Sequence, residues 1–129
     1  MTPGNADPLA TLECVVLDCP QPHVLAAFYR KLLGGTINQP DPRWAVSDGW
    51  ATLHTPTGQV LAFQAVDPYA APDWPDPKKP QQFHLNFHVA SLDLAHSAVL
   101  ASGARLLEST RGWRVYADPA GHPFCLVGK

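Results

Sequence analysis

The sequence predicts an α+β fold in which one order of elements, a strand, a helix and three further strands, occurs twice. Each half of the 129-residue chain begins with an apolar, strand-like run, followed by a segment with apolar residues at helical spacing. Three short β-rich runs separated by turn residues come next, and a proline-rich stretch divides the halves. Because neither unit can bury its sheet alone, we expect one domain, with the helices outside and a concave sheet face between them.

The first unit is expected over about residues 12–66, after a loose leader at 1–10. Its first strand is "LECVVLDC" (12–19), a β-rich apolar run. A helix over 20–35 is indicated by prolines at its entry, by basic residues in its last turns and by two glycines that end it. Turn residues then separate three expected strands, at 44–48, 50–55 and 59–66.

The stretch 67–82 contains five prolines and is interpreted as a linker, because neither a helix nor a central strand tolerates them. The second unit, about residues 83–128, repeats the order of the first. For its helix, Ser91 is the expected N-cap and Gly103 the expected stop. Its elements are expected at 83–90 (strand), 91–104 (helix), and 105–110, 112–119 and 123–127 (strands).

Composition and charge exclude several classes of protein. With 46% hydrophobic and 16% charged residues, the chain is typical of a globular protein. A net charge of −2 with scattered Lys and Arg argues against nucleic acid as a partner. No apolar run approaches a membrane span, and the first residues carry no secretory signal. Three cysteines without an export signal favour reduced thiols and a cytoplasmic location over a disulfide framework.

The stretch "FHLNFHV" (83–89) places polar residues at alternate positions of an otherwise apolar strand. Successive side chains of a strand point to opposite faces, so His84, Asn86 and His88 are expected on one face. The residues between them are apolar and predict a core face on the other side. The polar face then looks either into plain solvent or into a pocket that needs polar groups.

Four stretches resemble the vicinal oxygen chelate superfamily, in particular its glyoxalase-like and bleomycin-resistance-like branch. They are, in chain order, "VVLDCPQPHVLAAFYRKLLGG", "VLAFQAV", "FHLNFHVASLD" and "DPAGHPFCLV", and the resemblance covers about residues 12–128. It implies two βαβββ modules that form one open, mixed eight-stranded barrel around a ligand cleft. It also implies a homodimer.

The resemblance further implies four positions at which metal-using members usually place histidine or glutamate. They fall on Cys14, Gln64, His84 and Cys125, of which only His84 agrees with that pattern. Replacing both glutamates removes two negative charges from a hard, octahedral site. The two thiols and His84 could instead bind zinc if they converge, or the cysteines could simply fill space. We expect no cofactor, with a divalent metal (zinc or nickel) as the alternative.

Other candidate residues have a functional and a structural interpretation. Asp18 shares a strand face with Cys14 and is either a base at the cleft or a cap of the following helix. The aromatic residues either form a ligand wall or belong to core or dimer contacts. Trp74 in the linker is either a lid residue or an anchor for the linker. The residues expected to bind the ligand are Asn86, Gln64, Trp50, Phe63, Trp113 and Tyr116.

Two functions follow from these features. The first is an enzyme of the lyase or isomerase type that acts on a small oxygenated or electrophilic molecule in a cleft between the modules. Asp18, His84 and His88 would transfer protons. Chemistry of the glyoxalase I type is not expected, because it needs a Lewis-acidic metal to stabilise an enediolate. The alternative is a non-catalytic protein that sequesters an antibiotic or metabolite between aromatic walls; a pure interaction protein has the least support.

Overall fold

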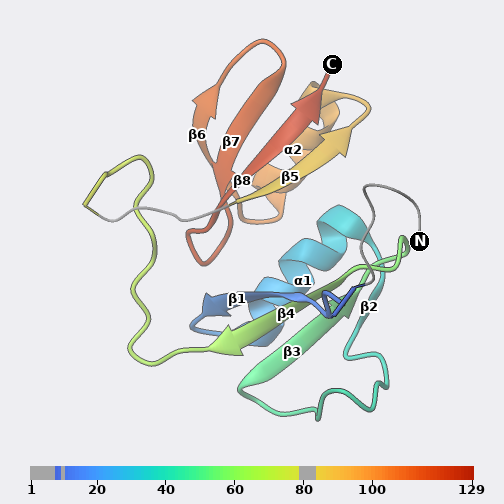
Figure 1. The fold of residues 1–129 in the computed structure, drawn as a ribbon. Helices are drawn as coiled ribbons and strands as arrows, with labels where there is room; N and C mark the ends of the chain where they lie inside the picture. Colours follow the sequence, from blue (N-terminus) through green and yellow to red (C-terminus); the bar gives the residue numbers. More distant parts are fainter. Residues whose placement is uncertain (1–7, 10, 79–83) are drawn as a thin grey trace.

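The computed structural model describes residues 8, 9, 11–78 and 84–129 and contains two repeated units (Figure 1). Most of the expected leader, the last part of the linker and Phe83 lie outside the described residues. The first unit contains β1 (Val15–Cys19), α1 (Pro22–Leu33), β2 (Thr36–Ile37), β3 (Trp50–His54) and β4 (Val60–Ala65). The second contains β5 (Leu85–Val89), α2 (Leu92–Ala101), β6 (Arg105–Ser109), β7 (Trp113–Ala117) and β8 (Pro123–Gly128). The predicted order of elements is confirmed in both halves.

Each unit forms its own four-stranded mixed sheet. The strand order is β1-β4-β3-β2 in the first unit and β5-β8-β7-β6 in the second. In both, the first strand pairs in parallel with the last strand, and the other pairs are antiparallel. The two sheets do not join into a closed barrel among the described strands, in agreement with the expected open form.

The helix boundaries follow the sequence signals. Pro22 occupies the first turn of α1, and the N–H of Gly34 closes the helix on the carbonyl of Arg30 at 2.7 Å. Ser91 caps α2 as predicted, because its hydroxyl accepts a hydrogen bond of 3.2 Å from the N–H of Leu94. No helix in the described part of the chain has the length and apolar character that crossing a membrane requires.

One expected strand is wrong. Residues 44–48 lie in a loop with a single bridge from Ser47 to Trp50, and the second strand is instead β2, directly after α1. The pairing of Thr36 with His54 depends on Gly35, because a Cβ on Gly35 would lie 2.1 Å from the carbonyl oxygen of His54. A strand of two residues is too short to show an alternating hydrophobic pattern in the sequence.

A single hydrophobic core joins the two units, with α1 between the sheets (Figure 1). The ring of Tyr29 on α1 stacks 5.8 Å from Phe63 of the first sheet and lies 6.2 Å from Phe124 of the second. The expected arrangement, with the helices outside and sheet faces between them, is therefore wrong for the single chain. The aromatic, helix-covered faces are the more apolar surfaces and are buried together. The opposite face of each sheet, here called its open face, carries no helix.

Candidate functional site

The open face of the second sheet carries the polar residues of "FHLNFHV". His84, Asn86 and His88 are exposed, whereas Leu85 and Phe87 pack against the core from the other face. The predicted alternation is confirmed. Cys125 of β8 lies on the same open face, because it is the register partner of Asn86 on β5.

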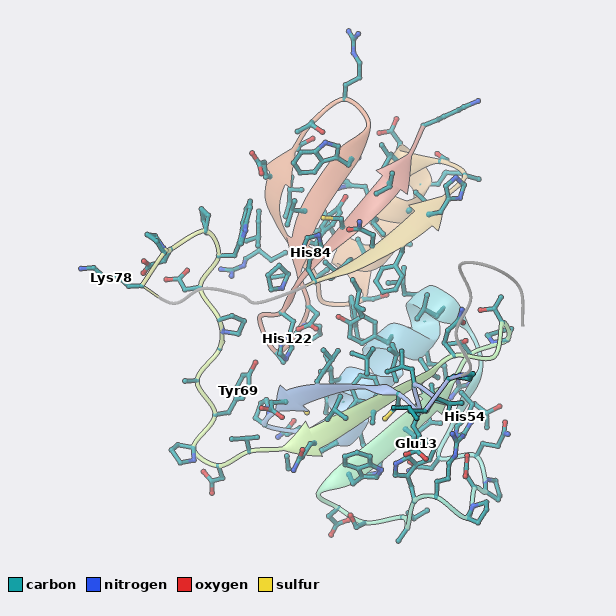
Figure 2. All side chains as sticks on the ribbon, in the orientation of Figure 1. Glu13, His54, Tyr69, Lys78, His84 and His122 are labelled. Atoms are coloured by element: carbon teal, nitrogen blue, oxygen red, sulfur yellow. The ribbon has the colours of Figure 1, made fainter. Side chains whose placement is uncertain are left out.

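A cavity of about 370 Å³ lies over this open face, called here the tryptophan cavity. One indole comes from Trp113 on β7 and the other from Trp74 in the linker. In Figure 2, His84 lies at the end of the second unit that is nearer to the first. The lining residues are Trp74, His84, Asn86, Trp113, Val115, Pro123, Cys125 and Val127. Largely apolar walls with a few polar groups are typical of small-molecule sites.

The polar groups of the tryptophan cavity offer hydrogen bonds and one proton-transfer group. Cys125 is only 8% exposed, and burial, followed by the charge of Glu108, raises the pKa of its thiol. It therefore remains a neutral, weakly donating S–H at neutral pH. The amide of Asn86 can donate and accept, and the imidazole of His84 can take or give a proton.

A second, larger hollow of about 840 Å³ lies between the two units and is called here the inter-unit groove. Cys14, the residue before β1, lines it together with Asn86 and His88 of β5. Leu33, at the end of α1, and Leu85 contribute apolar surface. The groove thus gathers three of the predicted site residues, but neither His84 nor Cys125 lines it.

Three predicted residues lie in a row across the open face of the first sheet. Gln64 on β4 is the register partner of both Asp18 on β1 and Trp50 on β3. Asp18 does not cap α1, one of the two alternatives for it, because Gln21 occupies the N-cap position and no side chain caps it. These three residues line neither the tryptophan cavity nor the inter-unit groove.

The four positions of the metal-using relatives do not come together within one chain. His84 and Cys125 line the tryptophan cavity, Cys14 lines the groove, and Gln64 lies on the first sheet. Among the described residues, no group of three or more His, Cys, Asp or Glu side chains is placed to hold a metal ion. Burial raises the pKa of both Cys14 and Cys125, which opposes the thiolate form that a metal needs. Within one chain, the donor set therefore does not fit a resident metal.

Two expected ligand-binding aromatics belong to the core instead. Phe63 and Tyr116 have no exposed surface, and both lie on helix-covered faces. Tyr116 bonds to His96 of α2 at 2.8 Å, and its neighbour on the same face, Arg114, pairs with Asp93 of that helix at 2.8 Å. The packing of α2 against β7 therefore determines which face of β7 holds Arg114 and Tyr116.

Sequence reasoning missed a polar cluster at the β7–β8 turn. Nε2 of His122 lies 2.5 Å from the carbonyl oxygen of Asp18, so the turn of the second unit contacts β1 of the first. Tyr69 of the linker donates a hydrogen bond of 2.7 Å to the carbonyl of Ala120. Tyr69 and His122 are both labelled in Figure 2. The only sequence signal was the turn "DPAG", which predicts a change of direction but no partner.

The comparison with protein families agrees with the fold and with the repeated units. A family model described as "Glyoxalase-like domain" matches residues 14–127, which include every predicted site residue. No curated protein matches the chain.

Several solved structures share the fold. A glyoxalase/bleomycin resistance protein/dioxygenase family enzyme from Burkholderia phytofirmans PsJN is similar with a TM-score of 0.71 and 19% identity, covering 92% of this chain and 98% of that one. A glyoxalase/dioxygenase from Nostoc punctiforme gives 0.69 and 22%, covering 100% and 95%. The fosfomycin resistance protein FosX from Listeria monocytogenes gives 0.67 and 15%, covering 94% of each chain. At these identities the likeness extends to the fold alone.

Proposed function

The chain belongs to the glyoxalase-like domain family, and from this membership and the geometry of the tryptophan cavity we propose that it binds a small, largely apolar and planar organic molecule. The observation that carries this proposal is the pair Trp74 and Trp113, which line one cavity with three polar groups. Indole faces favour flat rings, and desolvated aromatic contacts contribute strongly to binding. The volume of about 370 Å³ suits a molecule of one or two rings.

Sequestration without chemistry is the function that this geometry supports best. The three residues suggested for proton transfer are separated in one chain: His84 lines the tryptophan cavity, His88 lines the groove, and Asp18 lies on the first sheet. The polar groups beside the ligand, Asn86 and Cys125, are neutral and suited to orientation.

A lyase or isomerase activity is the second candidate, and the position of His84 favours it. An imidazole in the wall of a largely apolar cavity is a suitable general acid or base for a bound molecule. In this alternative His84 moves a proton between two atoms of the ligand. No metal takes part in either function as we propose it, because the donor set described above does not suit one.

We further propose that the protein is a homodimer in which the open sheet faces of two copies cover one another. Large apolar side chains remain partly exposed on these faces: Val16 is 38%, Val127 37% and Trp113 40% exposed. Trp113 and Val127 are register partners on β7 and β8, so their apolar surfaces adjoin, and an adjoining apolar surface of this kind is typical of protein interfaces. A second copy would bring Asp18, Gln64 and Trp50 of one chain toward the tryptophan cavity of the other.

Calorimetric titration with phenol, 2-naphthol and quinoline tests the binding proposal. We expect binding to the wild type and a loss of at least tenfold in Trp113→Ala, whose side chain is partly exposed, so that the fold tolerates its removal. Trp44→Ala is the matched control, because Trp44 lies in the loop beside His54 of the first sheet and should leave affinity unchanged. Equal loss in both variants, or no binding of any probe, contradicts the proposal.

Incubation of the bound probes with the protein, followed by mass spectrometry, separates the two candidates. An unchanged probe supports sequestration. A product whose formation stops in His84→Gln, while binding persists, supports the enzyme. Elemental analysis of wild type and His84→Ala tests whether the protein holds a metal. Stoichiometric zinc or nickel in the wild type that is lost in the variant contradicts the proposal that no metal takes part.

A further inference from the structure

The two hollows described above meet at one residue. Asn86 lines both the tryptophan cavity and the inter-unit groove. It lies on β5, which is the edge strand of the second sheet among the described strands, with β8 on one side only. A ligand in the tryptophan cavity can therefore extend past Asn86, over the free edge of β5, without crossing a layer of the fold.

The inter-unit groove is suited to an apolar chain. Leu32 and Leu33 of α1 form one part of its lining, and Leu85 and Phe87 of β5 form another. All four are only partly buried and pack against the core, so they present apolar surface to the groove. Among its described lining residues, only Glu13 carries a permanent charge. None of these described lining residues is a lysine or arginine that would favour an anionic chain.

We infer that the ligand has two parts: a planar ring held in the tryptophan cavity and an uncharged apolar tail that lies in the inter-unit groove. The ring contacts Trp74 and Trp113, the link passes Asn86, and the tail displaces water from the leucine and phenylalanine surface. This inference rests on the proposed function, since it assigns the ring to the same cavity. The ligand class is an alkyl-substituted aromatic molecule.

A series of 4-alkylphenols tests this inference by calorimetric titration. Phenol reports the ring site alone, and 4-ethyl-, 4-butyl- and 4-hexylphenol add a tail of increasing length. Each methylene that leaves water for the groove is expected to tighten binding by about threefold to fourfold. Binding of 6-(4-hydroxyphenyl)hexanoate, which has a similar tail ending in a carboxylate, is expected to be weaker than that of 4-hexylphenol because of Glu13.

Two variants test whether the gain in affinity with tail length arises in the inter-unit groove. Thr57→Trp adds bulk at an exposed position that lines the groove, and Leu33→Gln makes its wall polar. Both are expected to remove the dependence on chain length and to leave the affinity for phenol unchanged. Leu94→Gln is the matched control, since Leu94 is 77% exposed on α2 and lines neither hollow.

The outcomes separate this inference from the proposed function. If phenol binds and the longer homologues bind no more tightly, the two-part ligand is wrong while the ring site stands. The same holds if the gain with length persists in Thr57→Trp and Leu33→Gln. If phenol, its homologues, 2-naphthol and quinoline all fail to bind, the proposed function itself fails.

Discussion

The hydroxyl of Tyr29 donates a hydrogen bond of 2.6 Å to Oδ2 of Asp118, joining α1 of the first unit to the β7–β8 turn of the second. Both residues are buried: Tyr29 is 1% and Asp118 4% exposed. Oδ1 of Asp118 also accepts bonds from the N–H groups of Ala120 and His122. The carboxyl group thus stabilises its own turn and the contact with the first unit at the same time. A change at this group is therefore expected to affect how the two units pack together.

Asp118 is expected to make stability depend on pH. Burial raises the pKa of its carboxyl group above the ordinary 3.8, although the bond from Tyr29 works in the opposite direction. Because the folded chain holds this proton more tightly than the unfolded chain, the stabilising contribution is complete below the unfolded pKa and is lost as pH rises through the folded pKa. Asp118→Asn removes this contribution and keeps the acceptor for the turn.

Urea unfolding of wild type and Asp118→Asn at pH 7, 5.5 and 4 measures the effect, because the contribution is complete only near the ordinary pKa of 3.8. We expect the variant to be less stable by about 1 kcal/mol at pH 7 and its deficit to grow as the pH falls toward 4. Asp93→Asn is a suitable control: it lies on the exposed surface, and Arg114 lowers the pKa of its carboxyl group. A deficit that stays constant over this range contradicts the assignment.

Gly35 is expected to be irreplaceable. Its φ of +97° and the contact of a hypothetical Cβ with the His54 carbonyl both oppose any side chain. Gly35→Ala should cost about 3 kcal/mol or more, because β2 must separate from β3 to make room. Gly49→Ala, at a glycine with no atom near the hypothetical Cβ, should change the free energy of unfolding by less than about 1 kcal/mol. Equal urea midpoints for the two variants would show that β2 is dispensable.

The three thiols are expected to react with iodoacetamide in a defined order. Burial raises the pKa of Cys19, which has no exposed surface, to about 11, so this thiol should react last. Cys14 is partly exposed and should react first, with Cys125 between them. Saturating phenol should slow alkylation of Cys125, which lines the ring site, without slowing Cys14 in the groove. Peptide mass spectrometry at pH 7.5 measures all three rates. Protection of Cys14 alone would place phenol in the inter-unit groove and contradict its assignment to the tryptophan cavity.

Added nickel or zinc is not expected to produce glyoxalase I activity. That reaction needs a metal to stabilise an enediolate, and Gln64, Cys14 and Cys125 replace the usual donors. A spectrophotometric assay of lactoylglutathione formation from methylglyoxal and glutathione should therefore show only the background rate. Turnover comparable to that of a genuine glyoxalase I, with the same metal preparation, would overturn the interpretation of the donor set.

Local pattern was enough to predict the repeated units but not how they pack. The alternation of His84, Asn86 and His88 assigns their face correctly, because strand geometry alone determines it. Phe63 and Tyr116 were misplaced because the side of a strand that a helix covers depends on the crossing of that helix. Trp74 reaches its cavity through a linker without periodicity, and Tyr29 meets Asp118 across 89 positions of sequence. Such contacts are tertiary and leave no spacing to detect.

The proposed homodimer predicts a solution mass of twice the chain mass of 14.0 kDa. Val16 on the open face of the first sheet is 38% exposed, and a carboxylate there would lie two residues from Asp18, buried against the partner's apolar side chains. Val16→Glu should therefore shift the protein to the mass of one chain in light scattering after gel filtration. Val24→Glu, at a 53% exposed position of α1 outside both open faces, should remain dimeric. A monomeric wild type at about 100 μM, where specific homodimers of ordinary affinity are assembled, would rule out the dimer, as would equal dissociation of both variants.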